Sequence, residues 1–485
     1  MLYKINARYF LLIPVLLISG SLYAQRTKEE VIKSIDDKYA AYSAVAQKIW
    51  EYAEVGFQEE KSSALLQKEL TKEGFTIESG VAGMPTAFVA SYGKGKPVIA
   101  ILGEFDALPG VSQDATPELK PIPGKTSGHA CGHHLFGTAS AAAAIAVKKW
   151  MEANKIKGTI RFYGTPAEEG GSGKVYMVRS GLFADVDAVL HWHPAPANSA
   201  SASATLANKT GKFRFYGIAS HASASPERGR SALDGVESMN YMVNMLREHV
   251  TQETRIHYII TSGGEAPNVV PAYAEVYYYV RHPKRDEVKA VWERIEKAAQ
   301  GAALGTGTRL EFEITGGVYD VLPNKTLAVM MDSSLRAVKG YTYTAAEKEF
   351  AAAIQKTFTG DVPSLETTNQ IMPFEVKNTP HSASTDVGDV SWVVPTVGLG
   401  AATWVPGTAA HSWQAVAAGG TTIGYKGMMI AAKSLALTAI DLYNAPDKLK
   451  RAWEELNERR GTSFKYEALL GDRKPALDYR KIGAK

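Results

Sequence analysis

The feature that most constrains the fold is an alternation of short apolar runs with longer helical segments. The runs at residues 98–103, 159–164 and 187–193 have the length of buried strands. Segments 27–53, 59–73 and 135–153 have helical character, and Thr27 and Glu30 lie at capping-box spacing. Strands that alternate with helices predict an α/β core in which helices cover a sheet.

A different pattern interrupts this alternation in the middle of the chain. We expect a strand at 213–220, a helix at 232–249, strands at 256–261 and 275–281, a helix at 285–303 and a strand at 309–315. This β-α-β-β-α-β order is that of a ferredoxin-like module. The sequence therefore predicts a catalytic domain in two parts, 25–208 and 323–485, with a smaller domain, 209–322, inserted between them.

The N-terminus has the pattern of a signal peptide over residues 1–24. Lys4 and Arg8 precede an apolar run at 9–22, and Ala24 is a small residue suited to cleavage. The run is shorter than the roughly 20 residues that span a bilayer. We expect export to the periplasm or beyond the cell and no membrane attachment after cleavage; an uncleaved anchor is the alternative.

Charge and cysteine content narrow the possible partners. The net charge is +4 over 485 residues, and no Lys/Arg block is interleaved with aromatic residues, so nucleic acid is not an expected partner. Cys131 is the single cysteine, which excludes an internal disulfide. The stretch 448–485 is rich in both signs of charge, and we expect it to be a solvated helix and tail.

A cluster of metal-ligand residue types opens one predicted helix. The string Gly128-His-Ala-Cys-Gly-His-His134 holds three histidines and the cysteine. Thiolate and imidazole are good ligands for zinc and related divalent metals. Cys131 and His133 are two residues apart in a loop, so both can face one ion.

Two acidic pairs follow predicted strands. Glu104 and Asp106 come after the strand at 98–103, and Glu168 and Glu169 come after the strand at 159–164. Open α/β sheets place their sites at the carboxyl ends of strands. Of two adjacent carboxylates in extended chain, one can bind a metal while its neighbour accepts a proton from water.

Further candidates are weaker when taken alone. His191 and His193 lie on the same side of the strand at 187–193, so one could be a ligand and the other its hydrogen-bond partner. His411 stands in a Gly/Ala-rich loop, and the segment 384–389 could cap a helix or supply a supporting carboxylate.

Taken together these segments resemble the binuclear metallopeptidase family that includes glutamate carboxypeptidase, aminoacylases and auxin-conjugate amidohydrolases. The motifs occur in the family's order over nearly the whole mature chain. The strings 229–234 (GRSALD), 268–271 (NVVP) and 384–392 (STDVGDVSW) resemble the aminobenzoyl-glutamate utilisation branch. The resemblance implies a mixed-sheet, zinc-peptidase-like catalytic domain with an inserted dimerisation domain that serves as a lid.

The resemblance also implies a role for each candidate residue. It implies five ligands for two divalent ions, zinc or manganese: Cys131 as a bridge, His133, Glu169, His193 and His411. Glu168 would be the catalytic base and Asp106 would orient a histidine ligand. His221 would reach the partner's active site in a homodimer, and Asn268 and Arg281 would bind the substrate carboxylate. Peptidase relatives carry a histidine where this chain has Glu104, which leaves the identity of the metal open.

The expected activity is hydrolysis of the amide bond of a small N-acyl amino acid, with p-aminobenzoyl-glutamate as the leading substrate. The alternatives are another N-acyl-amino-acid or dipeptide hydrolase, or a metal-free periplasmic protein that binds acyl amino acids. No His-Glu-x-x-His or Gly-x-Ser-x-Gly string offers another hydrolytic mechanism.

Overall fold

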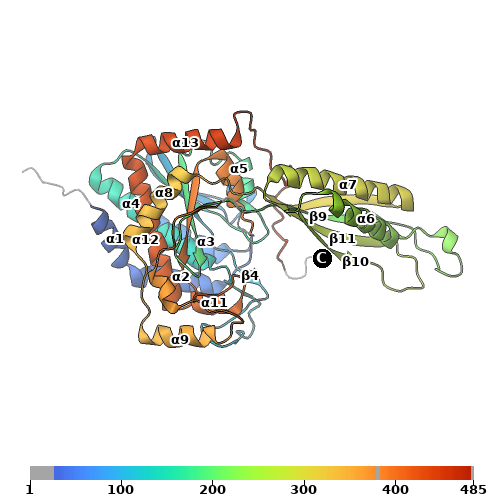
Figure 1. Ribbon diagram of the computed structural model, residues 1–485, viewed down its shortest axis with the longest axis horizontal. Helices are drawn as coiled ribbons and strands as arrows, with labels where there is room; N and C mark the ends of the chain where they lie inside the picture. Colours follow the sequence, from blue (N-terminus) through green and yellow to red (C-terminus); the bar gives the residue numbers. More distant parts are fainter. Residues whose placement is uncertain (1–26, 378–382, 482–485) are drawn as a thin grey trace, which may run out of the picture.

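The computed structural model describes residues 27–377 and 383–481. The chain forms two bodies that lie side by side, a larger α/β domain and a smaller four-stranded domain (Figure 1). The signal peptide predicted over 1–24 lies outside the described residues. Within the described ranges, no helix is both long and apolar enough to cross a bilayer.

The larger domain is built on a six-stranded sheet with the order β1-β2-β6-β3-β7-β14. The strands are β1 (Thr76–Ser79), β2 (Phe88–Lys94), β6 (Gly158–Gly164), β3 (Val98–Gly103), β7 (Ala188–Ala195) and β14 (Thr396–Ala402). The last four run parallel to one another, whereas β1 and β2 pair antiparallel. The expected mixed sheet is confirmed, and the carboxyl ends of its parallel strands meet at one edge.

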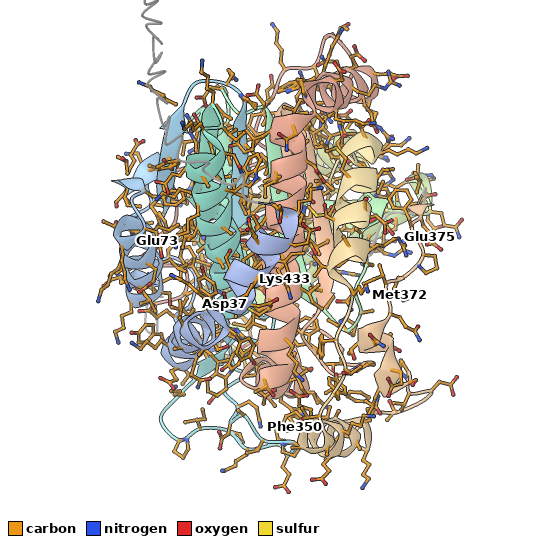
Figure 2. All side chains as sticks on the ribbon, turned by 90° about the vertical axis from the view of Figure 1, so that its left-hand side faces the viewer. Asp37, Glu73, Phe350, Met372, Glu375 and Lys433 are labelled. Carbon is orange, nitrogen blue, oxygen red and sulfur yellow. The ribbon has the colours of Figure 1, made fainter. Side chains whose placement is uncertain are left out.

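Helices cover both faces of this sheet. Alternate residues of β3 divide the two cores, since Ile99 and Ile101 pack into one and Ala100 and Leu102 into the other. The first core is covered by α4 (His133–Asn154), α8 (Lys325–Val338) and α12 (Thr422–Asn444), and the second by α5 (Gly173–Arg179) and α10 (Val387–Val393). Figure 2 shows α1 (Lys28–Asp36) against α4 and α12 on the face turned away from the smaller domain. There Lys433 of α12 forms an ion pair with Asp36.

The helix expected over 27–53 is two helices. The capping box of Thr27 and Glu30 is confirmed, but α1 ends at Asp36, and α2 (Tyr39–Tyr52) starts a new axis after Lys38. The remaining elements of the larger domain are α3 (Glu60–Lys72), α9 (Ala345–Gln355), α11 (Trp413–Gly419), α13 (Pro446–Arg460) and the short strands β4 (Leu108–Pro109), β5 (Ser127–Gly128), β8 (Ala202–Ser203) and β13 (Val376–Lys377).

The smaller domain has the predicted β-α-β-β-α-β order. Its elements are β9 (Ala207–Tyr216), α6 (Ala232–Leu246), β10 (Arg255–Ser262), β11 (Tyr273–His282), α7 (Arg285–Thr306) and β12 (Arg309–Val318). The strands form an antiparallel sheet with the order β10-β11-β9-β12, against which both helices pack. Phe213, Tyr278 and Trp292 meet in its core. The ferredoxin-like arrangement is therefore confirmed, although its first strand begins and ends earlier than the expected 213–220.

The stretch after α13 corrects a prediction. Residues 461–481, which we name the C-terminal strap, were expected to be solvated, yet Leu469 and Leu470 are buried. Phe464 packs against the core of the smaller domain, and Tyr479 packs against a core of the larger one. The apolar side chains of the strap stand among many charged ones. For this reason the composition indicated a solvated tail, whereas the strap packs against both domains.

Candidate metal centre

The candidate residues meet at the edge where the parallel strands end. Glu104 and Asp106 follow β3, Glu168 and Glu169 follow β6, His193 lies near the end of β7, Cys131 and His133 stand at the start of α4, and His411 precedes α11. Helix α4 can begin here because Gly132 adopts φ +74° in close contact with Pro194. The topology thus brings together residues from five separate segments, as expected for an open α/β sheet.

Three of these residues form a first ligand group. The donor atoms of Cys131, His133 and His193 lie within 4.8 Å of one another. The Cys131 Sγ and His193 Nε2 atoms are 3.4 Å apart. Two ligand atoms at about 2.0–2.3 Å from one zinc ion in tetrahedral directions are roughly 3.3–3.7 Å apart. The separation therefore suits two ligands of one ion.

A second ligand group shares the cysteine with the first. Cys131, Glu169 and His411 also bring their donor atoms within 4.8 Å of one another. Glu169 Oε1 lies 3.2 Å from His411 Nε2, again the spacing of neighbouring ligands. The adjacent Glu169 carboxylate raises the pKa of His411. His411 adopts φ +62°, in the left-handed region that residues other than glycine seldom take, although histidine takes it more often than most.

Asp106 fixes the orientation of His133. Its Oδ1 atom lies 2.8 Å from His133 Nδ1, and its Oδ2 atom accepts a hydrogen bond from the Glu169 backbone N–H at 2.9 Å. The Nε2 atom of His133 is thereby directed toward the ligand group. A carboxylate that holds a histidine in this way fixes its tautomer and raises its basicity as a ligand.

Glu168 forms a third possible ligand group with Glu104 and His133, and it stands on a strained loop. Ala167 has φ +57° and Gly170 has φ +91°, and the Ala167 N–H donates to the buried Glu59. Burial and the negative charges of Glu104, Glu169 and Asp386 raise the pKa of Glu168 well above its usual value. A carboxyl group that holds a proton this readily is suited to accept one during a reaction.

Lys174, at the start of α5, belongs to the site although the sequence analysis gave it no role. Its Nζ atom lies 2.7 Å from Glu104 Oε1 and 2.7 Å from Asp386 Oδ1, and all three side chains are at most 1% exposed. The Lys174 backbone N–H also donates to Asp386. Asp386 is thus the supporting carboxylate anticipated in the segment 384–389. One feature of the sequence could have indicated a role for Lys174. Acidic residues follow two of the predicted strands, and buried carboxylates require a compensating cation.

The polar atoms left without partners fit bound cations. Glu104 Oε2, His133 Nε2 and Glu169 Oε1 are buried without a hydrogen bond of good geometry. The nearest partners are close, since His133 Nε2 lies 3.0 Å from Glu104 Oε2 and Glu169 Oε1 lies 3.2 Å from His411 Nε2. Buried polar atoms are ordinarily well paired, so these atoms are available to bind an additional group. Carboxylate oxygens, a thiol and imidazole nitrogens are together the donor set of zinc and manganese sites.

The other histidines of the cluster have structural roles. His129 Nε2 lies 3.0 Å from the Ile49 carbonyl oxygen, and His134 Nε2 lies 3.0 Å from that of Gly419. Burial lowers the pKa of His129 to about 3 and that of His191 to about 3, so both rings are neutral. Of the pair on β7, His193 belongs to a ligand group, and His191 is absent from the groups found among the described residues.

The residues singled out in the smaller domain belong to none of the ligand groups found among the described residues. His221 is exposed and forms an isolated β-bridge with Val269, while the Ala222 N–H donates to the Asn268 carbonyl oxygen. His221 and Asn268 therefore occupy one corner of the domain. Arg281, near the end of β11, stacks over the ring of Tyr279 at 4.4 Å. None of the three occurs in a ligand group of the described residues.

Comparisons with known proteins agree with this geometry. Residues 205–306 match the peptidase dimerisation domain. The chain is 43% identical to one of the subunits of p-aminobenzoyl-glutamate hydrolase from Escherichia coli (strain K12), over 88% of this chain and 95% of that protein. It is 30% identical to the Xaa-Arg dipeptidase of Mus musculus, over 90% and 94% respectively. A crystal structure of a dinuclear metal-binding peptidase of the M20 family from Bacillus subtilis has the same fold, with TM-score 0.57, 19% identity and coverage of 84% and 99%.

Proposed function

Because the chain belongs to the M20 metallopeptidase family, we propose that it hydrolyses p-aminobenzoyl-glutamate to p-aminobenzoate and glutamate, using two divalent ions. One observation carries this reading: two ligand groups share Cys131, and Glu168 lies beside them. The substrate is inferred from the 43% identity to the E. coli hydrolase subunit.

The residues divide between the two ions as the ligand groups do. Cys131, His133 and His193 would hold one ion, and Cys131, Glu169 and His411 the other. Zinc or manganese suits this mixture of thiolate, imidazole and carboxylate. When bound, such cations polarise a carbonyl group and lower the pKa of water.

Glu168 performs the proton transfers in this proposal. Its carboxylate accepts a proton from the attacking water and then delivers it to the leaving nitrogen of the amide. Burial and the neighbouring carboxylates raise its pKa, and cations held by the adjacent ligands would oppose that rise. Asp106 keeps His133 and the Glu169 backbone in place during these steps.

The smaller domain would complete the site from a second copy of the chain. His221 is exposed and belongs to no ligand group of its own chain's described residues, which suits a side chain that enters the partner's site and stabilises the oxyanion. Asn268 and Arg281 would bind the carboxylate of the amino acid, for which a guanidinium fork is well matched. We propose a homodimer. The E. coli relative is named as one subunit of its hydrolase, which makes a partner of a different kind the alternative.

Export is a further part of the proposal. The signal-peptide pattern over 1–24 supports a periplasmic or secreted protein. N-terminal sequencing of the protein isolated from its host should find a chain that begins near Gln25. A chain that retains residues 1–24 and fractionates with membranes would instead support the anchor.

The test is hydrolysis of p-aminobenzoyl-glutamate by the protein freed of metal and then reloaded with zinc or manganese. We expect glutamate release that stops with a chelator and is absent in Glu168→Gln at the same ion content. If two ions bind but no glutamate appears, the substrate is wrong, and N-acyl amino acids and Xaa-Arg dipeptides form the next panel. If no ion binds, the metal-free binding protein replaces the hydrolase.

A further inference from the structure

The C-terminal strap ends against the loop that carries Glu168 and Glu169. The Tyr479 hydroxyl and the Arg480 Nη2 atom each donate a hydrogen bond of 3.0 Å to the backbone carbonyl oxygen of Glu169. These residues lie 310 and 311 positions apart from Glu169 in the sequence. One carbonyl oxygen of the metal-ligand loop thus receives two donors from the far end of the chain.

The strap completes the restraint of the Glu169 backbone. On one side its N–H donates to Asp106 Oδ2, and on the other its carbonyl oxygen accepts from the strap. The loop around it is held in left-handed conformations at Ala167 and Gly170, which an unrestrained loop would leave. Fixing both polar groups of Glu169 sets the directions in which the Glu168 and Glu169 side chains point.

Tyr479 itself is firmly seated. Its ring packs edge-on against Phe57 with centroids 5.6 Å apart, and the Gln58 side chain donates to the Leu477 carbonyl oxygen at 2.7 Å. A side chain at Gly56 would collide with the Tyr479 hydroxyl, since a Cβ atom there would lie 2.2 Å from it. The larger domain therefore has a complementary binding surface for the end of the strap.

The opposite end of the strap holds the smaller domain. Arg473 donates to the Ile314 carbonyl oxygen at 2.5 Å and to Glu313 at 3.0 Å, both on strand β12. Leu469 lies against Gly317 of the same strand and packs into the core of the smaller domain. The strap thus runs from the last strand of the inserted domain to the metal-ligand loop.

From these contacts we infer that the C-terminal strap is a positioning element of the metal centre, in which Tyr479 and Arg480 hold Glu169 in the geometry that binds the second ion. The inference rests on the proposed two-ion function. It assigns no chemical step to the strap, because neither residue touches the reacting atoms. Its specific consequence is that damage to the strap weakens the ion of the Cys131, Glu169 and His411 group and spares the ion of the Cys131, His133 and His193 group.

The test measures ion binding and activity in Tyr479→Phe, Arg480→Met and the double variant, with Lys474→Ala as the matched control. Lys474 lies on the strap with an exposed side chain, so its change should alter neither readout. Loss of one neutral and one charged hydrogen bond should lower the affinity for the second ion by roughly a hundredfold in the double variant. We expect kcat to fall in parallel at subsaturating metal, KM to stay within about twofold, and Arg480→Lys to restore part of the loss.

The inference is overturned if the double variant binds both ions with the affinity of the wild type, whatever its activity. Failure of the proposed function looks different, because the wild type itself would then bind ions without hydrolysing the substrate or would bind none. Circular dichroism identifies any variant that has unfolded. If the double variant unfolds, ion binding is compared between the wild type and the conservative Tyr479→Phe, which removes only the hydroxyl group.

Discussion

The two domains differ in how deeply they bury their ion pairs. The catalytic domain buries Lys174 between Glu104 and Asp386, with all three side chains at most 1% exposed. The smaller domain has an apolar and aromatic core, and its helix α7 forms ion pairs at the surface, such as Lys289 with Glu467. Buried charges are expensive unless they are paired. The larger domain therefore carries the costly buried charges beside the candidate metal ligands, whereas the smaller domain is held together mainly by apolar packing.

The domains also differ in how their candidate site residues are assembled. The two ligand groups that share Cys131 lie within a single chain. His221 of the smaller domain is exposed and belongs to no ligand group of the described residues. The role proposed for His221 therefore requires a second copy of the chain, whereas the proposed metal ligands do not.

The largest expected effect is that of Glu168→Gln. Loss of a general base lowers kcat by about 10²–10⁴-fold, and here we expect the upper part of that range because the same residue serves both proton transfers. Ion content, measured by elemental analysis, should remain that of the wild type. Activity within tenfold of the wild type would remove Glu168 from the base role.

Lys174→Met tests the contrast in burial. Removing one partner of a buried ion pair costs about 3–5 kcal/mol, since Glu104 and Asp386 would be left without their cation. The matched change Lys289→Met in the smaller domain breaks a pair whose side chains are 55% and 75% exposed, and should cost about 0–1 kcal/mol. Urea unfolding of both variants measures these losses in the free energy of unfolding. Similar losses in the two would show that the burial of charge does not distinguish the domains.

His221→Ala tests whether a second copy of the chain is needed. Losing an oxyanion donor lowers kcat by about 10²–10³-fold. Mixing inactive His221→Ala with inactive Glu168→Gln should then restore about a quarter of wild-type activity, since about half of randomly formed dimers would be mixed and each would hold one intact site. Mixtures that stay inactive after the protomers have exchanged would place His221 outside the partner's site.

The smallest effect concerns Asp389, at the junction of the domains. Burial raises its pKa from 3.8 to about 7, while it accepts hydrogen bonds from the Tyr319 N–H and the Tyr466 hydroxyl. Between pH 4 and about 7 the folded state therefore binds more protons than the unfolded state, so this group lowers stability as pH rises through that window. Relative to the wild type, Asp389→Asn should gain about 3 kcal/mol between pH 5 and pH 8 in urea unfolding. A stability difference that is the same at both pH values would contradict the raised pKa.

Much of the candidate centre could be predicted because its residues are of metal-ligand types and stand at strand ends, at a helix start and in loops near them. Cys131, His133, Glu169, His193 and His411 were identified from residue type, position and family resemblance, and the fold brings them into two groups. Lys174 was missed because a lysine is usually solvated, and its partner Asp386 lies 212 residues away. The strap was missed for a related reason: Leu469 and Leu470 stand in a charged stretch without the periodicity that reveals a helix or strand. Contacts between single residues far apart in the sequence produce no local sequence pattern from which they could be predicted.

The most direct test of two ions that share Cys131 is the metal content per chain of the wild type, His193→Ala and His411→Ala after gel filtration. The account predicts two ions in the wild type and one in each variant, because each histidine serves only one ligand group. One ion in the wild type that is lost entirely in both variants would contradict it, since the residues would then form a single site.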